Sequence, residues 1–189
     1  MISYTDLKPG VRVIVDGQPY EVTDSQFVRM QQRKPVMKTK LRSLLTGSVQ
    51  ERAFQPSDRL EEAELEKEDA AFLYAHRGEF WFSEPENSKN RFMMKEDLVG
   101  SGAQYLKPSL VVVVIKFQGK IIGIELPIKV EYKVVEAPPS ARGNTAQGGS
   151  KSITIESGAK VTTPLFVSEG DTIIVNTQTG EYVSRSEKK

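Results

Sequence analysis

The feature that most constrains the fold of this chain is a repeated pattern of short apolar runs separated by turn residues. Apolar residues occupy every second position of Val11–Val15, Asp16-Gly17 follows, and Tyr20–Val22 resumes the alternation. A period of two predicts strands with one buried face, and a glycine-containing pair between two strands predicts a hairpin. Similar pairs recur at Thr46-Gly47, Gln118-Gly119, Ser157-Gly158, Glu169-Gly170 and Thr179-Gly180. The pattern predicts an all-β protein.

The turn signals divide the 189 residues into three sections. Residues 1–63 fit a small SH3-like (KOW-like) barrel with a projecting hairpin. Residues 64–127 fit a central OB-type barrel, because strands enclose one short helix predicted at Lys95–Val99, and residues 128–189 fit a second OB-type barrel. The strands expected in the last two sections are Ala71–Tyr74, Glu79–Phe82, Val111–Phe117, Ile121–Leu126, Ile128–Val135, Ser152–Ile155, Thr162–Phe166, Thr172–Val175 and Tyr182–Ser184. The predicted architecture is three consecutive small β-barrels.

An enzymatic function finds little support in the sequence. Cysteine is absent, which excludes disulfides, thiolate metal sites and cysteine nucleophiles. His76, the single histidine, falls in a predicted hairpin turn, and no glycine-rich phosphate loop or nucleophile elbow is present. The longest apolar run, Leu110–Ile115, is too short to span a bilayer, and the first residues lack a signal pattern. We expect a soluble, cytoplasmic protein without catalytic residues, metal or cofactor.

A concentrated cationic segment lies in the first section. The window from Ser25 to Gln50 contains no acidic residue and six cations, which are Arg29, Arg33, Lys34, Lys38, Lys40 and Arg42. Its flanks, Phe27–Arg29 and Met37–Leu45, are predicted to be extended, with a polar turn between them. Such a hairpin suits phosphate groups and favours a nucleic-acid surface over ordinary solubilising charges. The acidic run that follows, Asp58–Asp69, fits either electrostatic steering or a solvated strand or linker.

Two further segments could carry binding. The aromatic residues Phe80, Trp81 and Phe82 could stack on bases, although alternation puts Phe80 and Phe82 in the core and leaves Trp81 as an interface or second-layer residue. The glycine-rich loop 142–149 offers a close backbone approach and short polar side chains at the mouth of a barrel. That loop fits either a ligand-binding element or a flexible connection.

Several segments, in order along the whole chain, resemble the signature of bacterial elongation factor P. They are Asp16–Tyr20, Lys40–Arg42 leading to Leu45–Gly47, Gly78–Trp81, Gly143–Thr145, Pro164–Val167, Glu169–Asp171 and Asn176–Arg185. The resemblance implies a three-domain, elongated, tRNA-like monomer. It implies binding to the ribosome, through ribosomal RNA and proteins, between the P and E sites. There it would position peptidyl-tRNA for peptide bond formation at stalling sequences such as polyproline, with no membrane partner and no chemistry of its own.

The resemblance also implies roles for particular residues. The tip loop that reaches the acceptor end of the P-site peptidyl-tRNA would be Met30, Gln31, Gln32, Arg33 and Lys34. The RNA-contacting basic face, predicted from the cationic segment itself, comprises Arg29, Lys38, Lys40 and Arg42. The loop that contacts the E-site codon of the mRNA would be Gly143, Asn144 and Thr145. The contacts to tRNA or the small subunit would be Tyr182 and Arg185.

The tip departs from the family pattern, in which a basic residue, modified in many members, lies between two glycines. Gln32 occupies that position here, so the modification does not carry over. The tip either works unmodified, with Arg33 or Lys34 supplying the charge, or carries a different modification on one of these two; we favour the first. Asn144 stands where an aspartate is usual. Two alternative functions remain, a divergent paralogue for other stalling motifs and a generic RNA-binding OB-fold protein.

Overall fold

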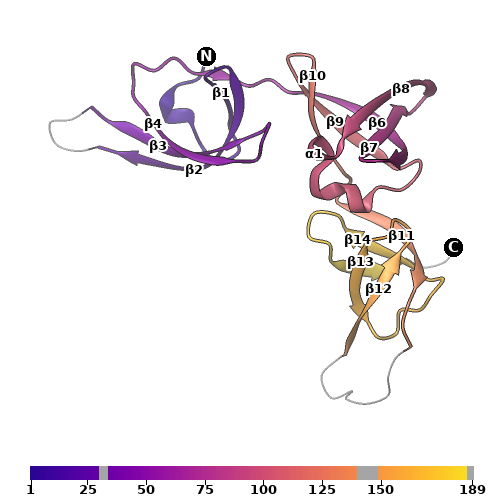
Figure 1. Ribbon diagram of the computed structural model, residues 1–189. Coiled ribbons are helices and arrows are strands. Elements are labelled where there is room, and N and C mark those ends of the chain that lie inside the picture. Colours follow the sequence, from indigo (N-terminus) through magenta and orange to yellow (C-terminus); the bar gives the residue numbers. More distant parts are fainter. Residues whose placement is uncertain (30–33, 140–148, 187–189) are drawn as a thin grey trace. The chain divides into compact units, whose positions relative to one another are not determined.

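A computed structural model describes residues 1–29, 34–139 and 149–186 (Figure 1). It is all-β and contains three five-stranded sheets that follow one another along the chain, which confirms the predicted fold class. The domain boundaries predicted above stay predictions. No helix in the described parts of the chain is long and apolar enough to cross a membrane.

The N-terminal sheet has the strand order β4-β3-β2-β1-β5 and follows a 3-10 turn, η1 (Tyr4–Asp6). Its strands are β1 (Arg12–Val15), β2 (Gln18–Val28), β3 (Val36–Ser43), β4 (Val49–Phe54) and β5 (Glu61–Glu62). Asp16 and Gly17 have φ angles of 51° and 76°, as a two-residue hairpin loop between β1 and β2 requires. Leu7, Val13, Val22 and Leu41 are fully buried beneath the sheet. The long β2–β3 hairpin extends beyond this core.

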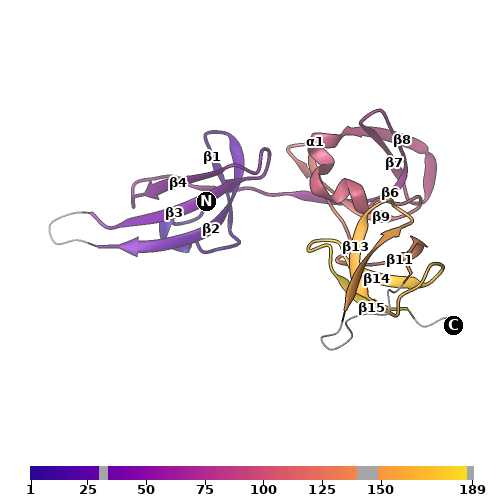
Figure 2. The ribbon, with the colours of Figure 1, turned by 60° about the horizontal axis from the view of Figure 1, so that its bottom comes forward.

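The central sheet has the strand order β10-β9-β6-β7-β8 and curls into a nearly closed ring (Figure 2). Its elements are β6 (Glu66–His76), β7 (Glu79–Glu84), β8 (Asn87–Lys95), α1 (Glu96–Val99), η2 (Gly100–Tyr105), β9 (Val111–Phe117) and β10 (Lys120–Glu125). Phe80 and Phe82 are buried, as predicted, together with Phe72 and Met94.

The structure differs from the expectations for this section in one strand boundary and in two additional elements. β6 begins within the acidic run, at Glu66, rather than at Ala71. β8 was not expected, because the first part of Asn87–Lys95 is polar and exposed and shows no alternation. The predicted helix Lys95–Val99 is confirmed as α1, and a 3-10 helix that was not predicted, η2, follows it to Tyr105.

The C-terminal sheet has the strand order β13-β12-β11-β14-β15. Its strands are β11 (Lys129–Glu136), β12 (Ser150–Ile155), β13 (Lys160–Pro164), β14 (Thr172–Asn176) and β15 (Tyr182–Arg185). Tyr132, Ile155, Ile173 and Val175 are fully buried in its core. β13 ends at Pro164, two residues before the predicted end, and this leaves Phe166 outside the strand with 59% of its surface exposed.

The segment that follows η2 packs against the C-terminal sheet. The hydroxyl of Tyr132 donates a hydrogen bond of 2.6 Å to the carbonyl of Tyr105, in a buried position. The Lys107 ammonium donates to the carbonyl of Glu131 at 2.6 Å and to Glu156 Oε1 at 3.0 Å, and it lies 5.2 Å from the centre of the Tyr132 ring. We call these five residues the joint.

The charges of the joint influence one another. Burial, helped by Tyr105 and by the charge of Glu156, raises the pKa of Tyr132 well above its usual range. Burial alone would also raise the pKa of Glu156. However, hydrogen bonds from Lys107 and from the Lys133 backbone, with the positive charge of both lysines, hold that pKa below its usual value. The joint therefore keeps Tyr132 neutral and Glu156 ionised.

Candidate nucleic-acid interface

The predicted cationic hairpin is formed by β2 and β3. The two strands pair from Tyr20↔Ser43 outward to Val28↔Val36. On β3 the residues alternate as predicted. Met37, Thr39, Leu41 and Ser43 are buried, whereas Lys38, Lys40 and Arg42 are exposed on the opposite face. The pleat of one strand thus places three cations in a row on the outer face of the sheet.

Neighbouring strands place acidic groups beside part of this row. Arg42 forms an ion pair with Glu21 on β2, with Nη2 and Oε1 3.1 Å apart. Lys40 lies between Asp24 on β2 and Glu51 on β4, which are its partners across the sheet. The acid-free window of the sequence therefore does not give an acid-free surface. Sequence reasoning missed these acids because strand register brings them in from outside the window.

The charge balance changes toward the tip of the hairpin. Lys38 lies between the uncharged residues Gln26 and Ala53 in the register of the sheet. Beyond it, Arg29 directly after β2 and Lys34 before β3 are exposed. The cations at the base of the hairpin thus have carboxylates directly opposite them. Lys38 has uncharged residues opposite it on both sides, and Arg29 and Lys34 lie outside the paired strands. The positive potential should be greatest at the tip end.

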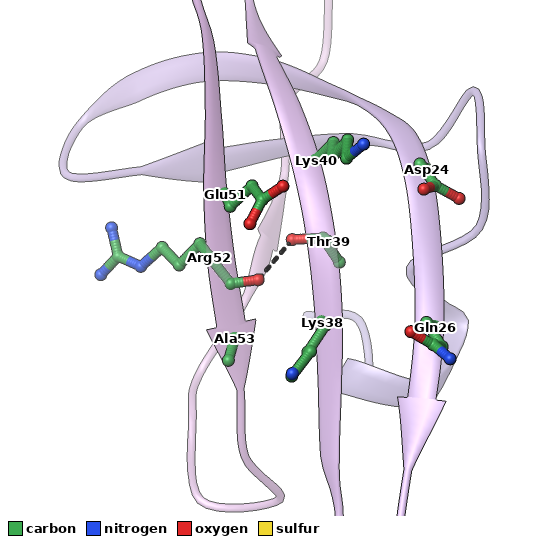
Figure 3. A pocket seen from close by; sticks show the side chains of 8 residues that line it. All are labelled: Asp24, Gln26, Lys38, Thr39, Lys40, Glu51, Arg52 and Ala53. Carbon is green, nitrogen blue, oxygen red and sulfur yellow. Dashed lines mark hydrogen bonds between the residues drawn. The ribbon is translucent and has the colours of Figure 1, made fainter.

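A hollow of about 450 Å³ lies on this sheet (Figure 3). It is lined by Asp24, Gln26, Lys38, Thr39, Lys40, Glu51, Arg52 and Ala53. The Thr39 hydroxyl donates to the Arg52 carbonyl at 2.9 Å, so it ties β3 to β4 beneath the hollow. The mixture of ammonium, amide and carboxylate groups suits a ribose-phosphate chain, which offers anionic oxygens and hydroxyl donors.

Two predicted loops lie outside the described residues. They are the tip residues Met30, Gln31, Gln32 and Arg33, and the codon-loop residues Gly143, Asn144 and Thr145. Of the predicted tip, only Lys34 is described.

Tyr182 and Arg185 lie on β15, the edge strand of the C-terminal sheet. Tyr182 is half-buried against the core. It also lines a hollow of about 840 Å³ that reaches Gly149, the last residue of the glycine-rich loop 142–149. Arg185 is exposed, with Nη1 3.9 Å from Asp171 Oδ2 and its guanidinium carbon 5.8 Å from the centre of the Phe166 ring. Phe166 and Asp171 thus lie beside the Arg185 guanidinium, within the range of a cation–π contact and a long ion pair.

Comparisons with known proteins agree over almost the whole chain. Residues 3–60 match the family model "Elongation factor P (EF-P) KOW-like domain", and residues 130–185 match "Elongation factor P, C-terminal". The chain is similar to elongation factor P of Coprothermobacter proteolyticus, with 40% identity over 98% of this chain and 99% of the relative. It is 36% identical to elongation factor P of Caldanaerobacter subterraneus subsp. tengcongensis, over 98% of this chain and 100% of the relative.

A solved structure shares the fold. Eukaryotic translation initiation factor 5A from Methanococcus jannaschii superposes with a TM-score of 0.53 at 17% identity, over 65% of this chain and 92% of that protein. The three sheets and these matches define the class of the protein as an all-β translation factor. Within that class, the chain belongs to the elongation factor P family.

Proposed function

We propose that this chain binds the ribosome between the P and E sites and positions peptidyl-tRNA so that peptide bonds form at stalling sequences such as polyproline. The observation that carries the proposal is the row of exposed cations on β3, which continues toward the tip of the β2–β3 hairpin. The chain aligns over 98% of its length with a member of the elongation factor P family, and this membership supports the ribosome as the partner of the row.

The charge gradient supports a directional role for the hairpin. Carboxylates lie directly opposite Arg42 and Lys40 at the base, whereas Lys38, Arg29 and Lys34 lie closer to the tip and the residues directly opposite Lys38 are uncharged. A phosphate chain should therefore be attracted most strongly at the tip end, where the acceptor end of a tRNA would lie in this proposal. The tip would act unmodified, with Arg33 or Lys34 supplying the charge.

The proposed contribution to the rate is positional. The chain would hold the peptidyl ester of the P-site tRNA in a reactive geometry and supply no nucleophile, general base, metal or cofactor of its own. The E-site codon loop, Gly143–Thr145, and the pair Tyr182 and Arg185 would fix the other end of the molecule on the mRNA and the tRNA. The hollow lined by both Tyr182 and Gly149 supports the proximity of Tyr182 to the end of the glycine-rich loop.

The test is a reconstituted translation system that lacks its own factor and is given this protein from a host unable to modify it. The reporter contains three consecutive prolines, and a second reporter contains another stalling motif. We expect wild-type protein to relieve stalling and Arg33→Ala to lose most of that relief. Lys129→Ala, which removes an exposed lysine from β11, is the matched control and should act as wild type.

Two results would contradict the proposal. Absence of ribosome binding by the wild-type protein would remove the proposed function altogether. Relief of the second motif without relief of the proline motif would assign the chain to a different stalling target, as a divergent paralogue would require.

A further inference from the structure

We propose that the outer face of the central sheet binds one unpaired RNA nucleotide, with its base stacked on Tyr74 and its phosphate held by Arg91. This site lies outside the hairpin, the codon loop and the Tyr182–Arg185 surface. Three features of the sheet support it: an exposed aromatic row, an adjoining small pocket, and the charge around them.

The aromatic row, two rings followed by a methionine, crosses three strands. Tyr74 on β6 is directly opposite Trp81 on β7, which is directly opposite Met93 on β8. A register shift between Phe72 and Tyr74 produces this alignment, because it inserts Leu73 as an extra residue in β6. Without the bulge, the tyrosine would not share a face with the tryptophan.

The row is exposed although it is apolar. Tyr74 exposes 46% of its surface and Met93 38%, and Trp81 is half-buried. The Tyr74 and Trp81 rings are nearly parallel, at 22°, with their centres 6.2 Å apart. Phe80 and Phe82 already fill the core on the other face, so folding does not require a second aromatic layer here. An exposed stacked pair is the platform on which bases stack in single-strand binding proteins of the OB class.

A pocket of about 260 Å³ adjoins Tyr74. Its lining is Phe72, Leu73, Tyr74, Arg91, Pro108 and Ser109. Two backbone hydrogen bonds fix its edge, from the Phe72 amide to the Leu110 carbonyl and from the Ser109 amide to the Phe72 carbonyl. Pockets for drug-sized ligands span about 300–1,000 Å³, so this pocket suits one smaller planar group. A base placed there would extend the Tyr74–Trp81 stack by one ring.

The charge of the face favours a nucleotide over an apolar protein segment. The pocket lining contains one cation, Arg91, and no carboxylate. The Arg91 Nε–H donates to the Ser88 carbonyl at 2.9 Å, which orients the guanidinium, and its Nη groups have no partner among the described residues. Lys95 adds a second cation on β8, although Glu79 lies directly opposite it. A guanidinium beside a stacking ring matches the base and phosphate of one nucleotide.

The chain provides its own probe of this site, because Trp81 is its only tryptophan. Full-length protein is titrated with single-stranded RNA hexamers of uridine or adenosine, and tryptophan emission is followed. An abasic hexamer of the same length presents the phosphates alone. We expect saturable quenching by the base-carrying hexamers and none by the abasic one.

Variants separate stacking from charge. Tyr74→Ala should weaken binding roughly 5- to 150-fold, the range for loss of one base–aromatic stack, while Tyr74→Phe should retain it. Arg91→Ala should weaken binding and reduce the slope of log affinity against log salt by about 1. Val111→Ala, which shortens another exposed apolar residue of the same sheet, is the matched control and should bind as wild type.

The titration is independent of the proposed ribosomal function, since it uses neither ribosomes nor the hairpin. Lys38→Ala, a hairpin variant, should leave the quenching unchanged even where it impairs translation. Equal quenching by the abasic hexamer, or unchanged affinity in Tyr74→Ala, would overturn the inference. A change in Trp81 emission with purified ribosomal proteins but with no RNA would also overturn it, and would identify the face as a protein interface.

Discussion

Replacing Tyr132 by phenylalanine removes one oxygen atom from the joint and directly tests how much the Tyr132 hydroxyl stabilises the C-terminal sheet. Tyr132 is fully buried, and its hydroxyl donates to the Tyr105 carbonyl at 2.6 Å. The variant keeps the ring, and therefore its contact with Lys107, but leaves a buried carbonyl without its donor. Loss of one partner from a buried hydrogen bond costs about 1–3 kcal/mol. The free energy of unfolding of the C-terminal sheet should fall by that amount.

The assay must observe this sheet locally, because a chain with several sheets need not unfold in one step. Native-state hydrogen exchange of amides in β11 and β14 meets this requirement. Protection should fall roughly 5- to 150-fold, since about 1.4 kcal/mol corresponds to a factor of ten. Tyr20→Phe, a hydroxyl deletion at a half-buried tyrosine of the N-terminal sheet, should change protection in β11 by less than about 2-fold.

The same variant has a predicted alkaline signature. Because burial raises the pKa of Tyr132, the folded chain keeps this proton after an unfolded tyrosine has lost it, above about pH 10. The unfolded state then binds fewer protons, so stability should decline as the pH rises past 10. Tyr132→Phe should remove this part of the decline. Unchanged protection in β11 at neutral pH, together with an unchanged alkaline slope, would refute the reasoning about the joint.

Three further predictions concern the joint and its surroundings. A Cβ added at Gly180 would lie 2.5 Å from the hydroxyl oxygen of Tyr105. Gly180→Ala should therefore lower the stability in urea unfolding more than Gly158→Ala, because Gly158 also has a positive φ but has open space where its Cβ would lie. Because folding lowers the pKa of Glu156, its carboxylate stabilises the folded state at pH values above the ordinary carboxyl pKa, and this stabilisation is lost as the pH falls. In Glu156→Gln, the free energy of unfolding should therefore decrease less steeply toward acidic pH. Phe166→Ala should weaken ribosome binding less than Arg185→Ala, because the Phe166 ring contacts the guanidinium while Arg185 itself would contact the RNA.

Local patterns in the sequence predicted the hairpin well. The alternation of β3 follows from side chains pointing to opposite faces every second residue, so both its buried and its exposed sets were predictable. The turn at Asp16-Gly17 was predictable for a similar reason, because positive φ at two successive positions strongly favours such pairs.

Features that depend on strand pairing were not predictable in the same way. The carboxylates of Asp24 and Glu51 reach Lys40 from two other strands, and only the register of the sheet reveals them. The bulge that aligns Tyr74 with Trp81 likewise depends on how β6 pairs with β7, since the sequence alone suggested only that Trp81 would face outward. Nonlocal pairing thus determined both the charge gradient of the hairpin and the aromatic row.

The central claim is that the cations nearest the tip of the β2–β3 hairpin position peptidyl-tRNA. It is tested most directly by the rate of Pro-Pro bond formation on stalled ribosomes, measured with wild-type protein, Lys38→Ala and Lys40→Ala. The two lysines share a strand and a face, but only Lys40 has carboxylates on both sides in the register. We predict that Lys38→Ala loses more of the acceleration and more of the salt dependence than Lys40→Ala. Equal effects, or acceleration that neither substitution reduces, would contradict the account.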